Sequence, residues 1–211
     1  MKLIFLGPPG AGKGTIADLA APALGLPHIS TGDLFRAAVK DETPLGLKVK
    51  GILASGGLVP DELTIALVEE RLAAPDARSG WILDGFPRTI PQAEALERLA
   101  PADKAVNFEV ADEVVIGRLS TRRVCRACGK IYNVRNMRPK QEGVCDACGG
   151  EVYTRDDDKE SSIKTRLENY RKQTAPLIDW YGSRGKLLTI GGEGGAEAVF
   201  AAFRAALGLN K

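Results

Sequence analysis

The stretch "FLGPPGAGKGT", residues 5–15, constrains this chain more than any other feature. A short apolar run leads into it and a helical pattern follows, so its glycines lie where a buried strand turns into a helix. Such glycines let phosphate oxygens approach inward-pointing backbone amides, and a lysine adds a positive charge. With Gly7, Gly12 and Lys13 at the motif positions, the stretch predicts a phosphate-binding loop. The alternative is a glycine-rich turn that binds nothing.

One position departs from the common form of this loop. There, Ser or Thr directly follows the lysine, and its hydroxyl binds the magnesium of a nucleoside triphosphate. Here Gly14 follows Lys13, and the hydroxyl arrives one place later, at Thr15. The loop alone therefore leaves open which group holds the metal.

Four more apolar runs follow, and none of the five alternates with polar residues. Helical patterns separate them, which is typical of parallel strands buried on both faces. The pattern predicts a doubly wound α/β fold with a five-stranded parallel sheet flanked by helices. The predicted strands are 3–6, 27–30, 81–84, 105–110 and 186–190.

Apolar residues at helical spacing fill the intervals between these runs. Pro22 deletes the amide that would bond to Asp18, so we expect a kink or an early end of the first helix there. A second helix is expected to begin near Thr31, and Asp61 is the expected cap of a third. The other predicted helices are 91–99, 111–122, 159–181 and 196–208.

Length and charge limit the class of protein. A chain of 211 residues suits one substantial core with a small appended module. Its 29 Lys and Arg stand against 27 Asp and Glu, a net charge of +2 that is far below that of a protein built to coat nucleic acid. No apolar run approaches the roughly 18 residues of a membrane span. We therefore expect a cytoplasmic protein with neither a nucleic-acid partner nor a membrane partner.

All four cysteines fall in one C-x2-C-x16-C-x2-C pattern, in a segment poor in apolar helices. Two such pairs offer four thiolates in a tetrahedron, which suits a structural zinc ion with no open position. Four buried free thiols are an alternative, and so is a nucleic-acid-binding zinc ribbon that uses the nearby arginines and lysine. The expected metal ligands are Cys125, Cys128, Cys145 and Cys148.

The segment "WILDGFPRT" places Asp84 at the end of a buried strand and Arg88 in the loop beyond it. Ligands of open α/β sheets bind at the carboxyl ends of the strands, so this pair is well placed for a metal and a phosphate. The alternative for Asp84 is a helix cap. The sole histidine, His28, has no acid nearby in the sequence and is expected to be structural.

Taken in order, "GPPGAGKGT", "STGDLFR", "GGLVPDE", "LDGFPRT", the cysteine pairs and "TRDDD" resemble the long-form adenylate kinases with a zinc-bearing lid. The resemblance covers nearly the whole chain, and Thr31 and Thr89 favour the adenylate branch over the uridylate/cytidylate branch. It implies a P-loop nucleoside triphosphate hydrolase-like fold with two insertions. The implied parts are a core of 1–29, 60–120 and 159–211, an AMP-binding insertion of 30–59 and a lid of 121–158.

The resemblance also implies site residues at the matching positions. Contacts to ATP are implied for Gly10, Ala11, Gly12, Lys13, Gly14, Thr15, Arg118, Arg122, Ile131 and Tyr132. Contacts to AMP are implied for Thr31, Arg36, Gly57, Leu58, Val59, Gly85, Phe86, Pro87, Arg88, Gln92, Arg155 and Arg166. The implied catalytic set is Lys13, Asp84, Arg88, Arg122, Arg155 and Arg166, with Asp157 and Asp158 restraining the arginines. Scattered arginines are usually solvated surface, so this set depends on their convergence in the fold.

The implied reaction is reversible transfer of a phosphoryl group from Mg²⁺-bound ATP to AMP, giving two ADP. In the family, water held by the counterpart of Asp84 binds the magnesium, so the hydroxyl missing after Lys13 is dispensable. The acceptor phosphate is already an anion, so the reaction needs alignment and charge neutralisation but no general base. We expect a monomer with ATP, AMP and ADP as substrates and a structural Zn²⁺. The alternatives are a kinase for another monophosphate, a zinc-ribbon nucleic-acid-binding ATPase, and iron in place of zinc.

Overall fold

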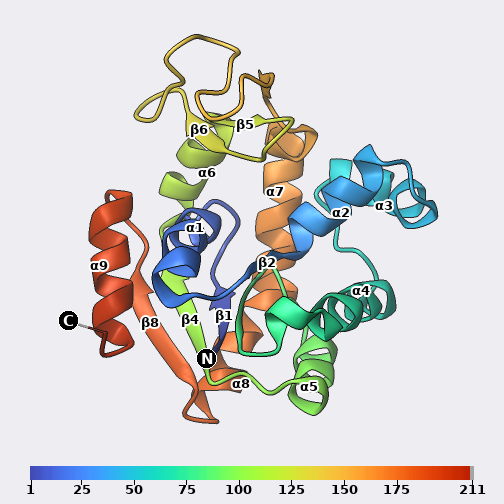
Figure 1. Cartoon of the computed structure of the whole chain (residues 1–211), viewed down its shortest axis with the longest axis vertical. Coiled ribbons are helices and arrows are strands. Elements are labelled where there is room, and N and C mark those ends of the chain that lie inside the picture. The colour runs from blue at the N-terminus through green and yellow to red at the C-terminus, as the bar shows by residue number, and fades with distance from the viewer. Residues whose placement is uncertain (210–211) are drawn as a thin grey trace.

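A parallel five-stranded sheet in the order β2-β3-β1-β4-β8 forms the centre of the molecule (Figure 1). The computed structural model describes residues 1–209, so the last two residues of the predicted core segment 159–211 lie outside the described part. All five predicted strands are present, and the predicted fold class is confirmed. The strands are β1 (Lys2–Leu6), β2 (His28–Ser30), β3 (Trp81–Asp84), β4 (Lys104–Glu109) and β8 (Leu187–Gly191).

Both faces of the sheet are covered by helices, which explains why the strands show no polar alternation. On β1, Leu3 and Phe5 join one buried cluster, whereas Ile4 and Leu6 join the other. Helices α1 (Lys13–Leu24) and α9 (Ala196–Ala206) pack on the first cluster. The second cluster is covered by α4 (Asp61–Ala73), α5 (Ile90–Leu99) and α8 (Pro176–Gly182).

Helix α1 continues through Pro22, so the expected early end is wrong. Pro22 lies in the last turn, where it removes a single helical hydrogen bond. Gly25, in the left-handed conformation at φ 63°, then closes the helix by donating its N–H to the Ala21 carbonyl. One lost bond near a well-capped end does not break the helix.

The expected cap of α4 is also wrong. Pro60 occupies the cap position, α4 begins at Asp61, and no side chain caps this end. The predicted helix 159–181 is divided into α7 (Glu160–Asn169), a π-helix (Tyr170–Thr174) and α8. Helix α6 (Asp112–Ser120) follows β4, and two short 3-10 helices span Pro75–Ala77 and Asp156–Asp158.

Two segments project from this core (Figure 1). Helices α2 (Thr31–Lys40) and α3 (Pro44–Ala54) pack on each other around Phe35, Val49 and Val59, and α3 was not predicted. At the far end of α6 stands a small antiparallel sheet of order β6-β5-β7. Its strands are β5 (Arg122–Cys125), β6 (Ile131–Asn133) and β7 (Val152–Tyr153). Within residues 1–209, no helix is both long enough and apolar enough to cross a membrane.

Candidate active site

A cavity of about 490 Å³ opens at the carboxyl ends of β1 and β3, beneath the small sheet. The loop between β1 and α1 forms its floor, and Arg122 and Ile131 reach it from the small sheet. A second cavity of about 60 Å³ adjoins it on the α2–α3 side. Ligands of open α/β sheets bind at this edge, so the cavity lies where the fold predicts a site.

The glycine loop holds its lysine over the cavity floor. Lys13 Nζ donates hydrogen bonds to the carbonyls of Gly7 and Pro8, both at 2.8 Å. Burial, assisted by nearby arginines and opposed by Asp84, lowers the pKa of Lys13 to about 8. Gly12 precedes α1 at φ 97°, a left-handed conformation that favours glycine. The loop therefore presents helix amides and a charge that a bound anion would stabilise.

Asp84 ends β3 and faces this loop, with Oδ2 3.5 Å from where a Cβ on Gly14 would lie. Burial raises its pKa, but neighbouring His28, Lys13 and Arg88 outweigh burial, so its pKa is lowered and the carboxylate is ionised. A buried, ionised carboxylate oxygen beside a phosphate-binding loop suits Mg²⁺.

His28 has two acidic neighbours in the fold, although no acid lies near it in the sequence. Nδ1 lies 3.0 Å from Asp18 Oδ1, and Nε2 lies 3.8 Å from Asp84 Oδ2. Burial lowers the pKa of His28, but the two aspartates outweigh burial and raise the pKa to about 9. Asp18 lies on α1 and Asp84 on β3, so only the fold brings them to the histidine.

Hydrogen bonds hold both the side chain and the backbone of Arg88. Its Nε donates to the Gly85 carbonyl at 2.8 Å, and its own carbonyl accepts from Thr174 Oγ1 at 2.9 Å. A Cβ on Gly85 would lie 2.9 Å from both Arg88 Nη2 and Thr31 Oγ1, so a larger residue there would displace them. Burial, above all, lowers the pKa of Arg88.

Two carboxylates hold two of the arginines that reach the cavity. Asp158, with a fully buried side chain, accepts from Arg122 Nε at 2.8 Å and Nη2 at 2.6 Å. Arg166 Nη1 lies 2.9 Å from Asp157 and 3.1 Å from Asp158. Burial lowers the pKa of Arg166 to about 10.

Arg155 is held less completely. It is 8 % exposed, and its Nε is buried without a hydrogen-bond partner among the described residues. Its Nη2 lies 3.9 Å from Asp33 Oδ1, a long ion pair. Burial, with Arg36 and Arg122 nearby, lowers its pKa to about 10. A buried guanidinium with an unused donor is suited to an anionic ligand.

The smaller cavity is lined by most of the residues expected at AMP. Thr31 Oγ1 donates to the Gly85 carbonyl at 2.9 Å, and Gln92 is 2 % exposed. Phe86 lines neither cavity, because its side chain packs in the hydrophobic core. The lining residues from the expected set are Thr31, Arg36, Gly57, Leu58, Val59, Gly85, Arg88, Gln92 and Arg166, while Pro87 lines the larger cavity.

On the opposite side, Arg118 Nη1 donates to the carbonyls of Gly192 at 2.9 Å and Ala11 at 3.3 Å. The glycine loop after β8 thus joins the cavity, which sequence reasoning missed. The signal was present, since "GGEGG" follows a predicted strand at the ligand-binding edge of the sheet. The unpredicted lining residues there are Gly192, Gly194, Gly195, Ala196 and Val199.

Tyr132 borders the cavity, but its side chain is 1 % exposed and packs among the cysteines. Its hydroxyl accepts from the Asp146 amide at 2.8 Å and lies 3.4 Å from Cys145 Sγ. Hydrogen bonding to Tyr132 is the main cause that lowers the pKa of Cys145 to about 6. Tyr132 therefore supports a thiolate, which is the form that binds metals.

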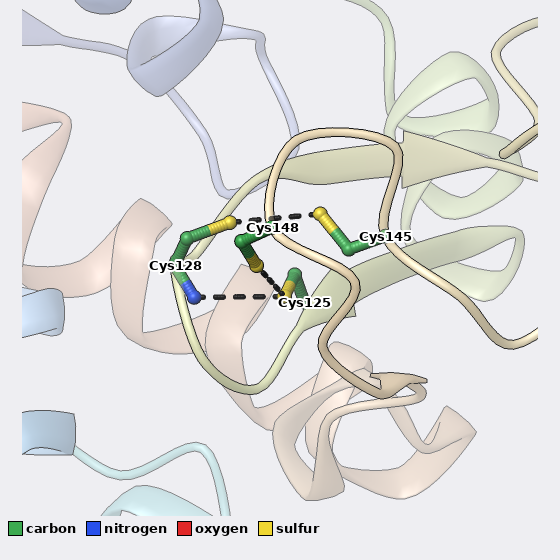
Figure 2. A group of neighbouring side chains, drawn as sticks. All are labelled: Cys125, Cys128, Cys145 and Cys148. Atoms are coloured by element: carbon green, nitrogen blue, oxygen red, sulfur yellow. Dashed lines mark hydrogen bonds between the residues drawn. The ribbon is translucent and has the colours of Figure 1, made fainter.

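The four cysteines converge at the tip of the small sheet (Figure 2). Their sulfurs lie within 4.8 Å of one another, with Cys125 to Cys148 at 3.5 Å and Cys128 to Cys145 at 3.6 Å. Zinc with thiolates at about 2.3 Å in a tetrahedron needs sulfurs about 3.8 Å apart. A Cβ on Gly150 would lie 3.1 Å from Cys125 Sγ, so glycine leaves the room that the sulfurs need. The group fits a four-thiolate metal site.

A phosphate-binding loop, an ionised aspartate and convergent arginines at the edge of a parallel sheet define a P-loop nucleotide-binding protein. The adenylate kinase family matches residues 5–186. An adenylate kinase of Treponema denticola is 53 % identical over 204 residues, covering 97 % of this chain and 98 % of the relative. One of Carboxydothermus hydrogenoformans is 55 % identical over 212 residues, covering 98 % and 99 %. The chain belongs to the adenylate kinase family, and the resemblance inferred from its motifs is confirmed.

Proposed function

We propose that this protein catalyses the reversible transfer of a phosphoryl group from Mg²⁺-bound ATP to AMP, giving two ADP, and so balances the adenine nucleotides. The observation that carries the proposal is the convergence of seven cationic side chains on one cavity. Burial, together with repulsion between neighbouring cations, lowers the pKa of several of them, so these charged groups favour an anionic partner. Phosphate groups would relieve this repulsion. The seven are Lys13, Arg36, Arg88, Arg118, Arg122, Arg155 and Arg166.

ATP would place its phosphates on the loop from Gly10 to Thr15, with its base beside Arg118 and the loop after β8. AMP would occupy the smaller cavity, with its phosphate toward Arg36 and Arg88 and its base toward Gln92. The two cavities share Arg88 and Arg166 in their walls. The acceptor phosphate would therefore meet the donor phosphates at these two arginines, which is the alignment that in-line transfer needs.

Lys13 and the arginines would neutralise the charge that spreads over the transferred group, and no side chain would need to remove a proton from AMP. Asp84 would hold Mg²⁺ through water, and the ion would supply further charge neutralisation on the donor phosphates. Asp157 and Asp158 hold Arg166 and Arg122 before substrates bind. Phosphates would replace part of these contacts when the small sheet closes, and closure would exclude water from the reaction.

The small sheet would be ordered by a structural Zn²⁺ bound to Cys125, Cys128, Cys145 and Cys148. Four thiolates leave no position for a substrate on the metal, so the ion would act on the lid rather than on the chemistry. We further propose a cytoplasmic monomer that binds no nucleic acid, in keeping with its net charge of +2.

A coupled assay with Mg²⁺-ATP against AMP, UMP, CMP and GMP tests the reaction. We expect AMP to give the highest kcat/KM. A higher kcat/KM for UMP or CMP would overturn the acceptor assignment. Transfer to none of the four, with ATP hydrolysed to ADP, would overturn the whole proposal.

A further inference from the structure

The carboxylate of Asp61 does not cap its own helix but joins Gln92 of α5 to Thr89, the residue that caps α5. Its Oδ1 accepts from Gln92 Nε2 at 2.7 Å, and its Oδ2 accepts from Thr89 Oγ1 at 3.0 Å. Thr89 in turn caps α5 by accepting from the Gln92 amide. Asp61 therefore holds the side chain of Gln92 directly and its backbone through Thr89, and Gln92 lines the smaller cavity.

The Gln92 amide is held from both ends. Its Oε1 accepts from the Arg88 backbone N–H at 2.8 Å, while its Nε2 faces Asp61. If the amide were rotated by half a turn, Nε2 would face a donor and Oε1 would face a carboxylate. Both contacts would become repulsive, so the surroundings allow one orientation only.

One hydrogen of Nε2 and one lone pair of Oε1 remain for a ligand. This pair matches the edge of adenine, which offers an amino donor beside a ring acceptor. Guanine offers a carbonyl acceptor beside a ring N–H donor, so both of its contacts with this amide would be repulsive. A fixed amide can discriminate between the two bases, whereas a mobile amide can adapt to either.

We propose that Asp61 is a positioning residue that sets acceptor specificity by fixing the orientation of the Gln92 amide. This inference rests on the proposed function, in which the base of the acceptor monophosphate lies against Gln92. Asp61 itself touches no substrate. Its effect reaches AMP through a single charge-assisted hydrogen bond, which restricts the side chain of Gln92.

The test compares steady-state kinetics of Asp61→Ala with AMP and with GMP as acceptors. We expect KM for AMP to rise about tenfold or more, as the loss of a hydrogen bond to a charged group predicts, and the AMP-to-GMP preference in kcat/KM to fall about tenfold. KM for ATP should stay within about threefold of its original value. Asp61→Asn keeps one acceptor oxygen and should restore most of the preference. An unchanged preference, equal losses for ATP and AMP, or no restoration by Asn would overturn the inference.

Glu62 provides a matched control, because it is an exposed acid in the same first turn of α4. Glu62→Ala removes the same charge from the helix N-terminus and should leave the preference unchanged. Gln92→Ala separates the assignment of the AMP site from the positioning role of Asp61. If that variant keeps the AMP-to-GMP preference, the base does not lie against Gln92, and the assigned AMP site fails. If it loses the preference, Asp61→Ala/Gln92→Ala should lose no more, since Asp61 acts only through Gln92.

Discussion

The core and the small sheet are ordered by different means. In the core, Phe5 packs against Phe108 with ring centroids 5.0 Å apart and against Phe203 at 5.4 Å, within clusters that fill both faces of the sheet. In the small sheet the buried cluster consists of Cys125, Tyr132 and Cys145, with Val152 packed against it. So small a cluster cannot stabilise a domain alone, and we therefore expect the small sheet to depend on the proposed metal, whereas the core has its own hydrophobic clusters.

The difference matters because one strand connects the two. β5 carries Arg122, which reaches the cavity, at one end and Cys125 at the other. A rise of about 3.3 Å per residue places the two roughly 10 Å apart on a single rigid strand. Order at the cysteines would therefore position the Arg122 charge at the proposed phosphate site, whereas Lys13, Asp84 and Arg88 are carried by elements of the core.

The largest expected effect is on the core side. Arg88→Lys should lower kcat about 100-fold or more with little change in unfolding temperature, because an ammonium cannot replace a bidentate guanidinium on a phosphate. Steady-state kinetics and thermal unfolding measure the two quantities. Arg98→Lys, a change on α5 outside both cavities, is the control and should leave kcat unchanged. Near-normal turnover of Arg88→Lys would place this side chain outside the reaction.

Removal of the metal should separate the two regions. Zinc stripping, or the double change Cys125→Ser and Cys128→Ser, should abolish amide exchange protection in 121–158 and leave the five-stranded core protected. The reason is that metal binding to a site absent from the unfolded chain contributes folding free energy, on the order of 10 kcal/mol. The unfolding temperature should fall because that folding free energy is lost. Phosphoryl transfer should fall because Arg122 on β5 is no longer positioned.

Elemental analysis of freshly purified protein supplies the first control for this experiment, and return of zinc to the stripped protein supplies the second. Zinc should restore both exchange protection and turnover in the original sequence but not in the serine variant. Protein purified without metal, or equal protection of the small sheet in both forms, would contradict the structural role. If elemental analysis found iron in place of zinc, the structural role of the metal would stand and only the identity of the ion would change.

Local features of this chain could be predicted from its sequence, whereas contacts between distant elements could not. The strands, the glycine loop and the cysteine pattern are local, so the sequence alone predicted them. The neighbours of His28 and Asp61 lie on other elements, and no local pattern can place them. Helix α3 was overlooked although Thr43 caps it and Pro44 starts it, which are ordinary helix signals.

A smaller effect, on metal release, is expected from removal of the Tyr132 hydroxyl, which lies beside the proposed metal ligands. Tyr132→Phe removes the group that lies 3.4 Å from Cys145 Sγ. Loss of such an outer contact typically weakens metal binding about tenfold, so zinc should pass faster to a chromogenic chelator. Tyr153→Phe is the matched control, because that ring lies in the same sheet but packs under Arg126, 3.9 Å from its guanidinium carbon. Equal release rates for Tyr132→Phe and the original protein would show that the hydroxyl does not act on the metal site.

The smallest effect should be confined to the core and depend on pH. The folded state raises the pKa of His28 to about 9 from its ordinary 6.5, so the protonated ring stabilises the fold fully below pH 6.5 and loses that contribution as pH rises to 9. His28→Gln keeps a polar group near Asp18 but cannot be charged. In urea unfolding, the variant should be less stable by about 1–2 kcal/mol at pH 6, and the difference should vanish near pH 9.5, because neither residue is then charged. Amide exchange in 121–158 should be unchanged, since the acidic partners of His28 within residues 1–209 lie on α1 and β3. A stability difference that does not vary with pH would mean that the His28 ring acts through packing rather than charge. A loss of amide exchange protection in the small sheet would show that the core and the small sheet are not stabilised independently.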